Sequence, residues 1–281
     1  MTILVTGAGG RIGATVLRQL YEQGRPVRAA GRTQPADLPG GADLPGGVEW
    51  VELDLAAPTS AARALAGVEQ VFLYAQPEGA EQLLKVAADA GLRHIVLLSS
   101  LAIDHDAGQP GPIARQHLLV ERAIEVSGIG ATVLRPGAFA SNALQWAAQI
   151  RAEGRVAMPY PDTHSEPVHP DDLAQVAVRA FDDGPAGAVH RITGPQSLSA
   201  REQVRAIATA INGPIEVREI DPQTYAQQLA AHVPATFVRS LLDYQRERDG
   251  QPGPVYDVAA LLGRPARSFA TWATENVTSF S

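Results

Sequence analysis

The sequence contains no cysteine, which excludes disulfide bonds, thiolate catalysis, iron–sulfur clusters and cysteine-ligated zinc. It has no apolar run near the roughly 18 residues that a membrane-spanning helix needs. No basic segment followed by an apolar one opens the chain, so we expect a cytoplasmic protein without a signal peptide. A basic excess is also missing: the formal charge of −7 argues against binding to nucleic acid or to an anionic membrane.

What the 281-residue chain does have is an ordinary globular composition, 45% hydrophobic and 19% charged. In its first half, short β-rich runs alternate with helical patterns, which predicts a parallel sheet with right-handed crossovers. The expected strands cover residues 3–6, 26–30, 48–53, 70–74, 94–99 and 130–134. The expected helices cover residues 12–23, 59–66, 79–90 and 115–126. The sequence therefore predicts an α/β fold with a Rossmann-like, doubly wound parallel sheet.

The pattern changes after Pro136. Helical segments are then expected at residues 143–153, 171–181, 200–211, 222–229 and 235–248, with short strands at 189–193 and 215–220. We interpret residues 1–136 as a nucleotide-binding domain to which residues 171–193 return. Residues 137–281 are interpreted as a smaller, substrate-binding C-terminal lobe over the mouth of the sheet. The segment 34–47, rich in proline and glycine, predicts a surface loop.

A glycine-rich turn directly follows the first expected strand and opens the first helix: Gly7-Ala8-Gly9-Gly10-Arg11-Ile12-Gly13. Gly7 permits a tight turn, Gly10 lets a pyrophosphate approach the backbone, and Gly13 permits close helix–strand packing. The helix N-terminus adds free N–H groups and the positive end of its dipole. This placement predicts a dinucleotide phosphate site; the alternative is a glycine-rich turn that binds nothing.

The end of the second expected strand indicates which dinucleotide is bound. An NAD site places Asp or Glu there, about 20 residues after the glycine turn, but residues 27–33 contain no carboxylate. Arg32 can instead pair with a 2′-phosphate, and Arg11 can hold that group from the other side. The sequence therefore predicts NADPH as the cofactor, unless both arginines are simply solvated.

The ends of the third and fourth expected strands complete this cofactor site. Asp54 and Leu55 stand where an adenine edge is expected, although Asp54 alternatively caps the helix expected near residue 59. Where the middle of the cofactor is expected to pass, the sequence has Tyr74, Ala75 and Gln76. These five residues are therefore predicted to bind the cofactor.

Further motifs extend along nearly the whole chain: Ser99-Ser100, Glu121, Arg135-Pro136-Gly137-Ala138-Phe139, Asn142, residues 168–174 and residues 261–269. With the glycine turn and Asp54-Leu55, they resemble the short-chain dehydrogenase/reductase superfamily, specifically its atypical, NmrA-like branch. The chain is similar to tailoring ketoreductases of aromatic polyketides of the angucyclinone type. The resemblance implies that Ser99 lies at the cofactor and that the stretch Pro136, Gly137, Ala138 and Phe139 borders the nicotinamide.

The catalytic set of that superfamily is a serine after the fifth strand and a Tyr-x-x-x-Lys pair, often with a glutamate four residues later. Ser100 fits the serine. Counting back from Glu121 places His117 at the lysine position and Ile113 at the tyrosine position, and no tyrosine precedes a lysine by four. The usual proton donor, worth about 10²–10⁴-fold in rate, is therefore missing. Three sources of the proton stay open: His117, Ser100 or a phenol of the substrate itself.

Each candidate outside the glycine turn has a plainer alternative. His117 either acts as an acid or is a ribose-facing or structural helix residue. Ser100 either donates to the substrate or only ends the strand. Asn142 and Trp146 are expected to contact substrate, but Asn142 alternatively caps a helix beginning at residue 143, and Trp146 alternatively packs in the core.

Two histidines and an aspartate lie in the proline-rich stretch after residue 160. His164 and His169 match no helical spacing of metal ligands, so no metal site is expected. Asp171 has the place and the residue type of a helix start.

Two classes of function follow. The first is an NADPH-dependent ketoreductase acting on a bulky, hydrophobic aromatic molecule of polyketide or quinone-like type, or an NAD(P)H:quinone reductase. The second is a regulatory protein that senses NADP(H) without chemistry, which the missing tyrosine favours. An isomerase or epimerase is less compatible with that absence. The oligomeric state stays open, because fold analogy does not fix it.

Overall fold

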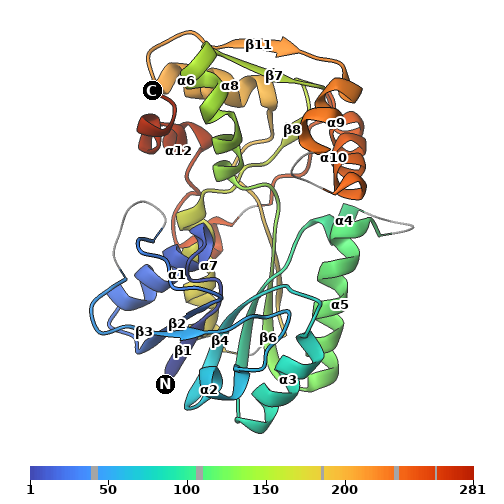
Figure 1. The fold of residues 1–281 in the computed structure, drawn as a ribbon. Coiled ribbons are helices and arrows are strands. Elements are labelled where there is room, and N and C mark those ends of the chain that lie inside the picture. The colour runs from blue at the N-terminus through green and yellow to red at the C-terminus, as the bar shows by residue number, and fades with distance from the viewer. Residues whose placement is uncertain (39–43, 106–109, 185–186, 231–233, 257) are drawn as a thin grey trace. The chain divides into compact units, whose positions relative to one another are not determined.

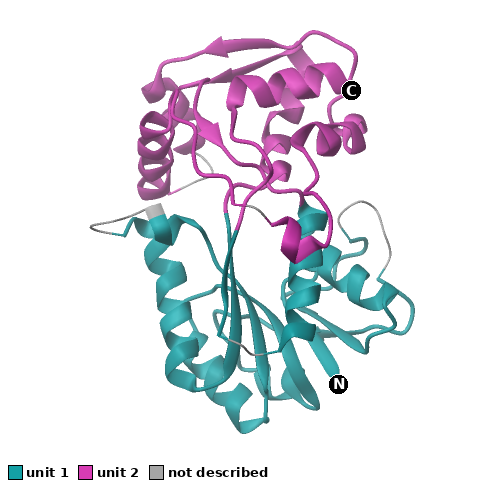
Figure 2. Ribbon diagram, turned by 180° about the vertical axis from the view of Figure 1, so that it is seen from behind, with its two compact units in different colours: residues 1–136, 170–191 teal, residues 137–169, 192–281 magenta. Residues whose placement is uncertain are grey.

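The computed structural model describes residues 1–38, 44–105, 110–184, 187–230, 234–256 and 258–281. The chain forms two compact units (Figure 2). The first comprises residues 1–136 and 170–191, and the second comprises residues 137–169 and 192–281. None of the helices in these described ranges has the length and apolarity that crossing a bilayer requires.

A seven-stranded sheet in the order β3-β2-β1-β4-β5-β6-β9 forms the centre of the first unit (Figure 1). The neighbouring pairs from β3 to β6 are all parallel. This is the Rossmann strand order, so the predicted α/β, doubly wound parallel fold is confirmed. Its strands are β1 (Thr2–Val5), β2 (Val27–Gly31), β3 (Glu49–Glu52), β4 (Val68–Tyr74), β5 (His94–Leu98), β6 (Gly130–Pro136) and β9 (Val189–Ile192).

Helices cover both faces of this sheet (Figure 1). On one side α1 packs against α7, and on the other α3 packs against α2 and α5. Every residue of β5 is buried, as expected for a parallel strand covered on both faces. The helices of this unit are α1 (Arg11–Glu22), α2 (Ala61–Leu65), α3 (Ala80–Asp89), α4 (Ala102–His105), α5 (Pro112–Ser127) and α7 (Pro170–Asp183).

The second unit is built from short helices and two small two-stranded sheets. In one sheet β11 (Glu216–Glu219) pairs parallel with β7 (Arg155–Met158), and in the other β10 (Leu198–Ser199) pairs antiparallel with β8 (His164–Ser165). Its own core contains Phe269, Trp272 and Phe280. The remaining elements are η1 (Ala140–Trp146), α6 (Ala147–Glu153), α8 (Ala200–Ala210), α9 (Pro222–Ala230), α10 (Ala235–Glu247), α11 (Ala259–Leu262), α12 (Phe269–Glu275) and η2 (Val277–Ser279).

Two local expectations differ from the structure. The single helix expected over residues 143–153 is a 3₁₀ helix, η1, followed by α6. Asn142 is therefore not a helix cap: it lies inside η1, and its N–H already donates to the Phe139 carbonyl at 3.0 Å. Asp54 does not cap a helix near residue 59 either, because its Oδ1 accepts from the Ala56 N–H at 3.0 Å and α2 begins only at Ala61.

The segment 34–47 was expected to be a surface loop. Residues 39–43 lie outside the described part of the chain. In the rest of the segment, Gly46 and Gly47 are exposed, but Leu38 is buried, so this segment also contributes an apolar side chain to the interior. The helix start expected at Asp171 is confirmed, since Asp171 lies in the first turn of α7.

Candidate functional site

The glycine turn between β1 and α1 depends on its lack of side chains. Gly7 has a φ of +61°, a left-handed conformation that favours glycine. A Cβ on Gly13 would lie 2.2 Å from the Gly7 carbonyl oxygen, so only glycine lets the helix approach the strand this closely. The Gly10 N–H donates to that same carbonyl at 2.8 Å and begins α1. The first N–H groups of α1 therefore point out of a turn formed entirely by backbone.

Tyr74, at the end of β4, lies against this turn. Its ring carbons would be 2.8 Å from a Cβ on Gly7. Burial raises the pKa of Tyr74 to about 12, and a hydrogen bond from the Gly13 N–H to its hydroxyl partly opposes that rise in pKa. The neutral hydroxyl thus uses one of the N–H groups at the start of α1, beside the path predicted for the middle of the cofactor.

Both predicted phosphate-binding arginines lie at the edges of the turn. Arg11 is the first residue of α1, and Arg32 directly follows β2. Both are exposed, and neither forms an ion pair with another described residue. Their guanidinium groups are therefore open to an anion, and the predicted contact with a 2′-phosphate stays a prediction.

Trp50 is a neighbour of this turn that sequence reasoning missed. Its ring would lie 2.9 Å from a Cβ on Gly31 and 3.7 Å from one on Gly9. The half-buried ring of this β3 residue thus forms a wall beside the turn and the end of β2. A tryptophan at an otherwise polar strand position was the available signal.

The other predicted cofactor residues lie at the carboxyl ends of their strands. Asp54 and Leu55 follow β3, and Ala75 and Gln76 follow β4. The Ala75 N–H donates to the Leu98 carbonyl at 3.3 Å, and the Gln76 amide donates to Glu78 at 2.5 Å. In open parallel sheets, ligands bind at this edge.

A buried network of charges joins α5 to β6 and α4. The Ser99 hydroxyl donates to Glu121 at 2.5 Å, and Arg135 donates to both oxygens of Glu121, at 3.1 and 2.6 Å. A third Arg135 nitrogen donates to Asp104 at 2.7 Å, and Arg191 donates to the same carboxylate at 2.5 Å. The side chains of Arg135, Glu121 and Asp104 are each less than one-fifth exposed. The Ser99 hydroxyl is therefore engaged in holding this network together.

His117 lies one helical turn before Glu121 on α5. Its Nδ1 is buried and has no hydrogen-bond partner among the residues that the structure describes. Burial lowers the pKa of His117, and the Glu121 carboxylate opposes that change in pKa. Its imidazole is therefore neutral at physiological pH, and an ordinary histidine cation is disfavoured there.

Ser100 and Ile113 have plain surroundings. The Ser100 hydroxyl accepts the Ala102 N–H at 3.2 Å, so it closes the turn into α4. No hydrogen bond within the described residues joins Ser100 to His117. Ile113, at the expected tyrosine position, is 43% exposed. The structure thus offers no assembled Ser–Tyr–Lys set at these positions.

The second unit contains a cavity of about 140 Å³ whose walls are rich in aromatic side chains. Asn142 and Trp146 both line it, and so do Ala138 and Phe139 from the stretch after β6. Trp146 also packs on the core of this unit, as its plainer alternative expects, and its contact with substrate stays a prediction. The other lining residues are Ala143, Gln145, Met158, Pro159, Tyr160, Thr163, Ser165, Ala200, Gln203, Tyr225, Leu241, Tyr244 and Gln245.

Three of those wall residues are tyrosines that the sequence did not single out. Tyr160, Tyr225 and Tyr244 come from separate segments, so no local motif signals their meeting. Burial raises the pKa of Tyr225. Burial also raises the pKa of Tyr244, while Arg248 opposes the rise in that pKa. Both hydroxyls are therefore protonated at neutral pH and can donate hydrogen bonds.

The stretch after β6 is fixed by backbone hydrogen bonds. The Gly137 N–H donates to the Ile192 carbonyl at 2.9 Å, and the Val168 N–H donates to the Ala138 carbonyl at 2.8 Å. The Ala140 N–H returns to the Val168 carbonyl at 2.9 Å. Ala138 and Phe139 are thus held rigidly at the wall of the cavity.

The two histidines of the proline-rich stretch each have a partner. His169 is buried and bonds to Glu275 at 2.8 Å through Nε2. His164 approaches the Ser197 hydroxyl at 3.3 Å through Nδ1. Across the described ranges, no cluster of three His, Asp or Glu side chains is arranged to hold a metal ion.

The strand order is that of a Rossmann fold, and the glycine turn with its exposed guanidinium groups is typical of those Rossmann folds that bind dinucleotides. Residues 7–184 match the NAD(P)H-binding family, and the chain belongs to it. It is 35% identical over 99% of both chains to a (4-alkanoyl-5-oxo-2,5-dihydrofuran-3-yl)methyl phosphate reductase from Streptomyces griseus. It is 31% identical, again over 99% of both chains, to an NAD(P)H azoreductase from Xenophilus azovorans. The protein is an NAD(P)H-dependent oxidoreductase of this family.

Solved structures share the fold over the whole chain. Triphenylmethane reductase from Citrobacter sp. superimposes with a TM-score of 0.81 at 20% identity, covering 99% of this chain and 100% of that one. NmrA, a negative transcriptional regulator, superimposes with a TM-score of 0.73 at 17% identity, covering 99% and 95%. The fold is thus that of NmrA-like proteins, and it occurs in a reductase and in a regulator alike.

Proposed function

We propose that this protein is an NADPH-dependent reductase that transfers hydride to a conjugated carbonyl acceptor, such as a quinone or an aromatic ketone of polyketide type. The first unit binds the cofactor through residues 7–13 and the carboxyl ends of β2, β3, β4 and β5. The second unit binds the substrate in the cavity of about 140 Å³, called the smaller cavity below, with Asn142 and Trp146 in its wall. The stretch from Pro136 to Phe139 continues directly from β6 into that wall.

The preference for NADPH is supported by the charges around the glycine turn. Arg32 and Arg11 are exposed and without an ion-pair partner among the described residues, and no carboxylate ends β2. A 2′-phosphate gains charge-assisted hydrogen bonds from guanidinium groups, whereas a ribose diol needs a carboxylate. The cofactor supplies the hydride.

The observation that carries the proposal is the face of α5 where the superfamily has its proton donor. Ile113 and a neutral His117 stand there, so no strong acid meets a developing alkoxide. A conjugated acceptor needs such an acid least, because the negative charge spreads over the whole π system. For a quinone, hydride transfer is itself the two-electron reduction and gives a hydroquinone monoanion. This anion then takes one proton from water, or from a cavity hydroxyl that water reprotonates.

The relatives support this class of acceptor. One is named for azo groups and the other for a 5-oxo-2,5-dihydrofuran ring. Both kinds of molecule place the reducible double bond in conjugation. A phenolic ketone of the angucyclinone type belongs to the same class, since its own phenol can supply the proton.

Tyr225 and Tyr244 are hydroxyl donors that line the cavity. Both are protonated at neutral pH at the ordinary pKa of tyrosine, and burial raises each pKa further. A hydrogen-bond donor aimed at a developing oxyanion raises the rate roughly 10–100-fold when the rest of the site is unchanged. Tyr225→Phe and Tyr244→Phe are therefore expected to lower kcat/KM more than Ser100→Ala or His117→Ala.

The test is NADPH oxidation by the purified protein with 1,4-naphthoquinone and, as an unconjugated control, cyclohexanone. We expect the quinone to be reduced with a kcat/KM about 100-fold or more above that of cyclohexanone. The Ser100→Ala, His117→Ala double variant is expected to keep the quinone activity within about threefold. A loss near the 10²–10⁴-fold worth of a general acid would instead assign proton donation to one of that pair.

A second outcome separates the enzyme from a sensor. The missing tyrosine is the specific feature that a non-catalytic NADP(H)-sensing regulator shares. If titration calorimetry shows tight NADPH binding while no quinone, enone or azo compound oxidises the cofactor, the sensor function replaces the reductase.

A further inference from the structure

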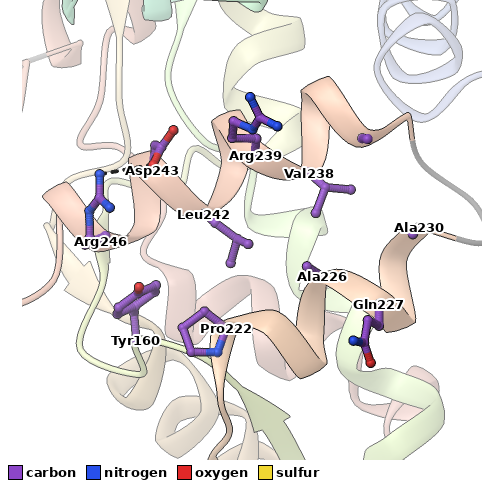
Figure 3. A pocket seen from close by; sticks show the side chains of 11 residues that line it. Tyr160, Pro222, Ala226, Gln227, Ala230, Val238, Arg239, Leu242, Asp243 and Arg246 are labelled. Atoms are coloured by element: carbon purple, nitrogen blue, oxygen red, sulfur yellow. Dashed lines mark hydrogen bonds and ion pairs between the residues drawn. The ribbon is translucent and has the colours of Figure 1, made fainter.

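A second, larger cavity of about 480 Å³ lies between α9 and α10 in the second unit (Figure 3). Its volume falls within the roughly 300–1,000 Å³ of small-molecule sites. Pro222 and Ala226 of α9 face Val238 and Leu242 of α10 across it, whereas Arg239 and Asp243 extend from the other side of α10. The space between the two helices is therefore apolar, with charges at its rim.

This larger cavity adjoins the smaller one. Tyr160 lines both. On α9, Tyr225 faces the smaller cavity and Ala226 the larger. On α10, Leu241 faces the smaller cavity and Leu242 the larger. Two helices and one tyrosine ring thus form a common wall.

Tyr160 has an unusual backbone. Its φ is +49°, in the left-handed region that non-glycine residues rarely adopt. The other described non-glycine residue with positive φ is Asn212, an asparagine just beyond α8, where this conformation is common. Tyr160 instead precedes Pro161, within a turn. Such strain persists only where the surroundings impose it, and it concentrates at functional positions.

Hydrogen bonds around the turn impose that conformation. The Thr163 N–H donates to the Tyr160 carbonyl at 3.0 Å, and the Arg201 N–H donates to the Pro161 carbonyl at 2.9 Å. The Gly250 N–H donates to the Asp162 carbonyl, also at 2.9 Å. The Tyr160 ring is therefore held at the common wall by the start of α8 and the segment after α10.

We propose that the larger cavity binds an apolar alkyl substituent of the same substrate whose conjugated carbonyl lies in the smaller cavity, with Tyr160 setting the width of the passage. This inference rests on the proposed function. Its basis is that the two cavities adjoin: both are lined by the strained, firmly held Tyr160 ring and by residues of α9 and α10. The occupant is an apolar chain because the residues that face one another across the cavity, Pro222, Ala226, Val238 and Leu242, carry no charge. The charged lining residues are Arg239, Asp243 and Arg246, and the last two form an ion pair with each other.

The test uses 1,4-naphthoquinones carrying no substituent, a 2-propyl chain or a 2-octyl chain. Each buried methylene is worth about 0.8 kcal/mol, or roughly fourfold in affinity. We expect kcat/KM to rise by at least about 30-fold from propyl to octyl in the wild type. Ala226→Trp fills the cavity and is expected to reduce this ratio to about threefold. Gln228→Trp, an exposed position of α9 outside both cavities, is the matched control and keeps the wild-type ratio.

Tyr160→Gly tests the passage itself. Glycine adopts a positive φ without strain, so the turn is expected to fold. The preference for a linear 2-hexyl over a branched 2-cyclohexyl substituent should fall by about tenfold in this variant, since the ring no longer narrows the passage. An unchanged preference would show that Tyr160 does not set the width.

Turnover and binding together separate this inference from the proposed function; binding is measured by quenching of protein fluorescence. If unsubstituted naphthoquinone is reduced and the octyl-to-propyl ratio of kcat/KM is equal in wild type, A226W and Q228W, the inference is overturned and the reductase stands. Absence of turnover with every quinone overturns the reductase. In that case, tighter binding of the octyl compound to wild type and Q228W than to A226W supports the larger cavity as its site. Equal binding to all three proteins overturns the inference as well.

Discussion

The candidate site in the first unit is built from backbone, and the candidate site in the second unit is built from side chains. In the first unit, the glycine turn is one contiguous segment whose geometry depends on backbone: Gly7 turns at positive φ, and Gly13 leaves no room for a Cβ. In the second unit, the smaller cavity is made of side chains from η1, β8, α8, α9, α10 and the segments between them. A site made of backbone dictates residue type locally, whereas a wall of side chains can be assembled from many residue types far apart in sequence.

The most severe test of this contrast is Gly13→Ala. The added Cβ would lie 2.2 Å from the Gly7 carbonyl and 3.0 Å from that of Thr6. Because backbone on both sides must shift, we expect a loss of about 3 kcal/mol or more in the free energy of unfolding. NADPH binding is expected to be lost as well, as measured by urea denaturation and titration calorimetry. Gly46→Ala, with open space around its Cβ, should change neither by more than about 0.5 kcal/mol.

Arg135→Met is expected to have the next largest effect. It leaves the Glu121 carboxylate without its cation, while Asp104 keeps its pair with Arg191, and breaking a buried pair costs about 3 kcal/mol. Arg93→Met, which removes an exposed pair with Glu69, should cost less than about 1 kcal/mol. Both free energies of unfolding are measured by chemical denaturation. An equal decrease in the two variants would mean that the network stabilises the fold no more than an exposed ion pair does.

Arg32→Ala removes a side-chain component of the site in the first unit without touching the backbone of the turn. We expect the Kd for NADPH to rise about 10–100-fold, since one charge-assisted hydrogen bond to phosphate is worth roughly 1.5–3 kcal/mol. The Kd for NADH should stay within about twofold in the same calorimetric titration. Arg63→Ala, an exposed arginine of α2, serves as the control. Equal weakening of both cofactors would contradict a phosphate contact.

The same contrast decides what the sequence could predict. The parallel sheet was predictable because several of its strands are apolar runs and a glycine turn follows the first. Asn142 and Trp146, predicted to contact substrate, both line the smaller cavity, and the alternative capping role of Asn142 is excluded by η1. Tyr160, Tyr225 and Tyr244 could not be predicted, because long-range packing alone brings them together. The charge network was only half visible: Glu121 and Arg135 were noted, but nothing in their spacing indicated Asp104 as a partner.

The smallest expected effect concerns His117 and pH. Burial lowers the pKa of His117 in the folded state, so below about pH 6.5 the unfolded chain binds a proton that the folded chain resists. The unfolded state then holds more protons, and the free energy of unfolding decreases as the pH falls. His117→Gln removes this contribution, so its stability should fall less steeply than that of wild type between pH 7 and pH 5.

Denaturation at a series of pH values measures these slopes, with Gln116→Ala, an exposed neighbour on α5, as the control that keeps the wild-type slope. The network makes a sharper version possible. Arg135 pairs with Glu121 and so weakens the effect by which this carboxylate raises the pKa of His117. In an Arg135→Met background, Glu121 acts on His117 unopposed, so the pKa of His117 moves back up and replacing His117 should change the slope less than in wild type. If His117→Gln changes the pH slope of stability equally in both backgrounds, the Arg135–Glu121 pair has no effect on the pKa of His117.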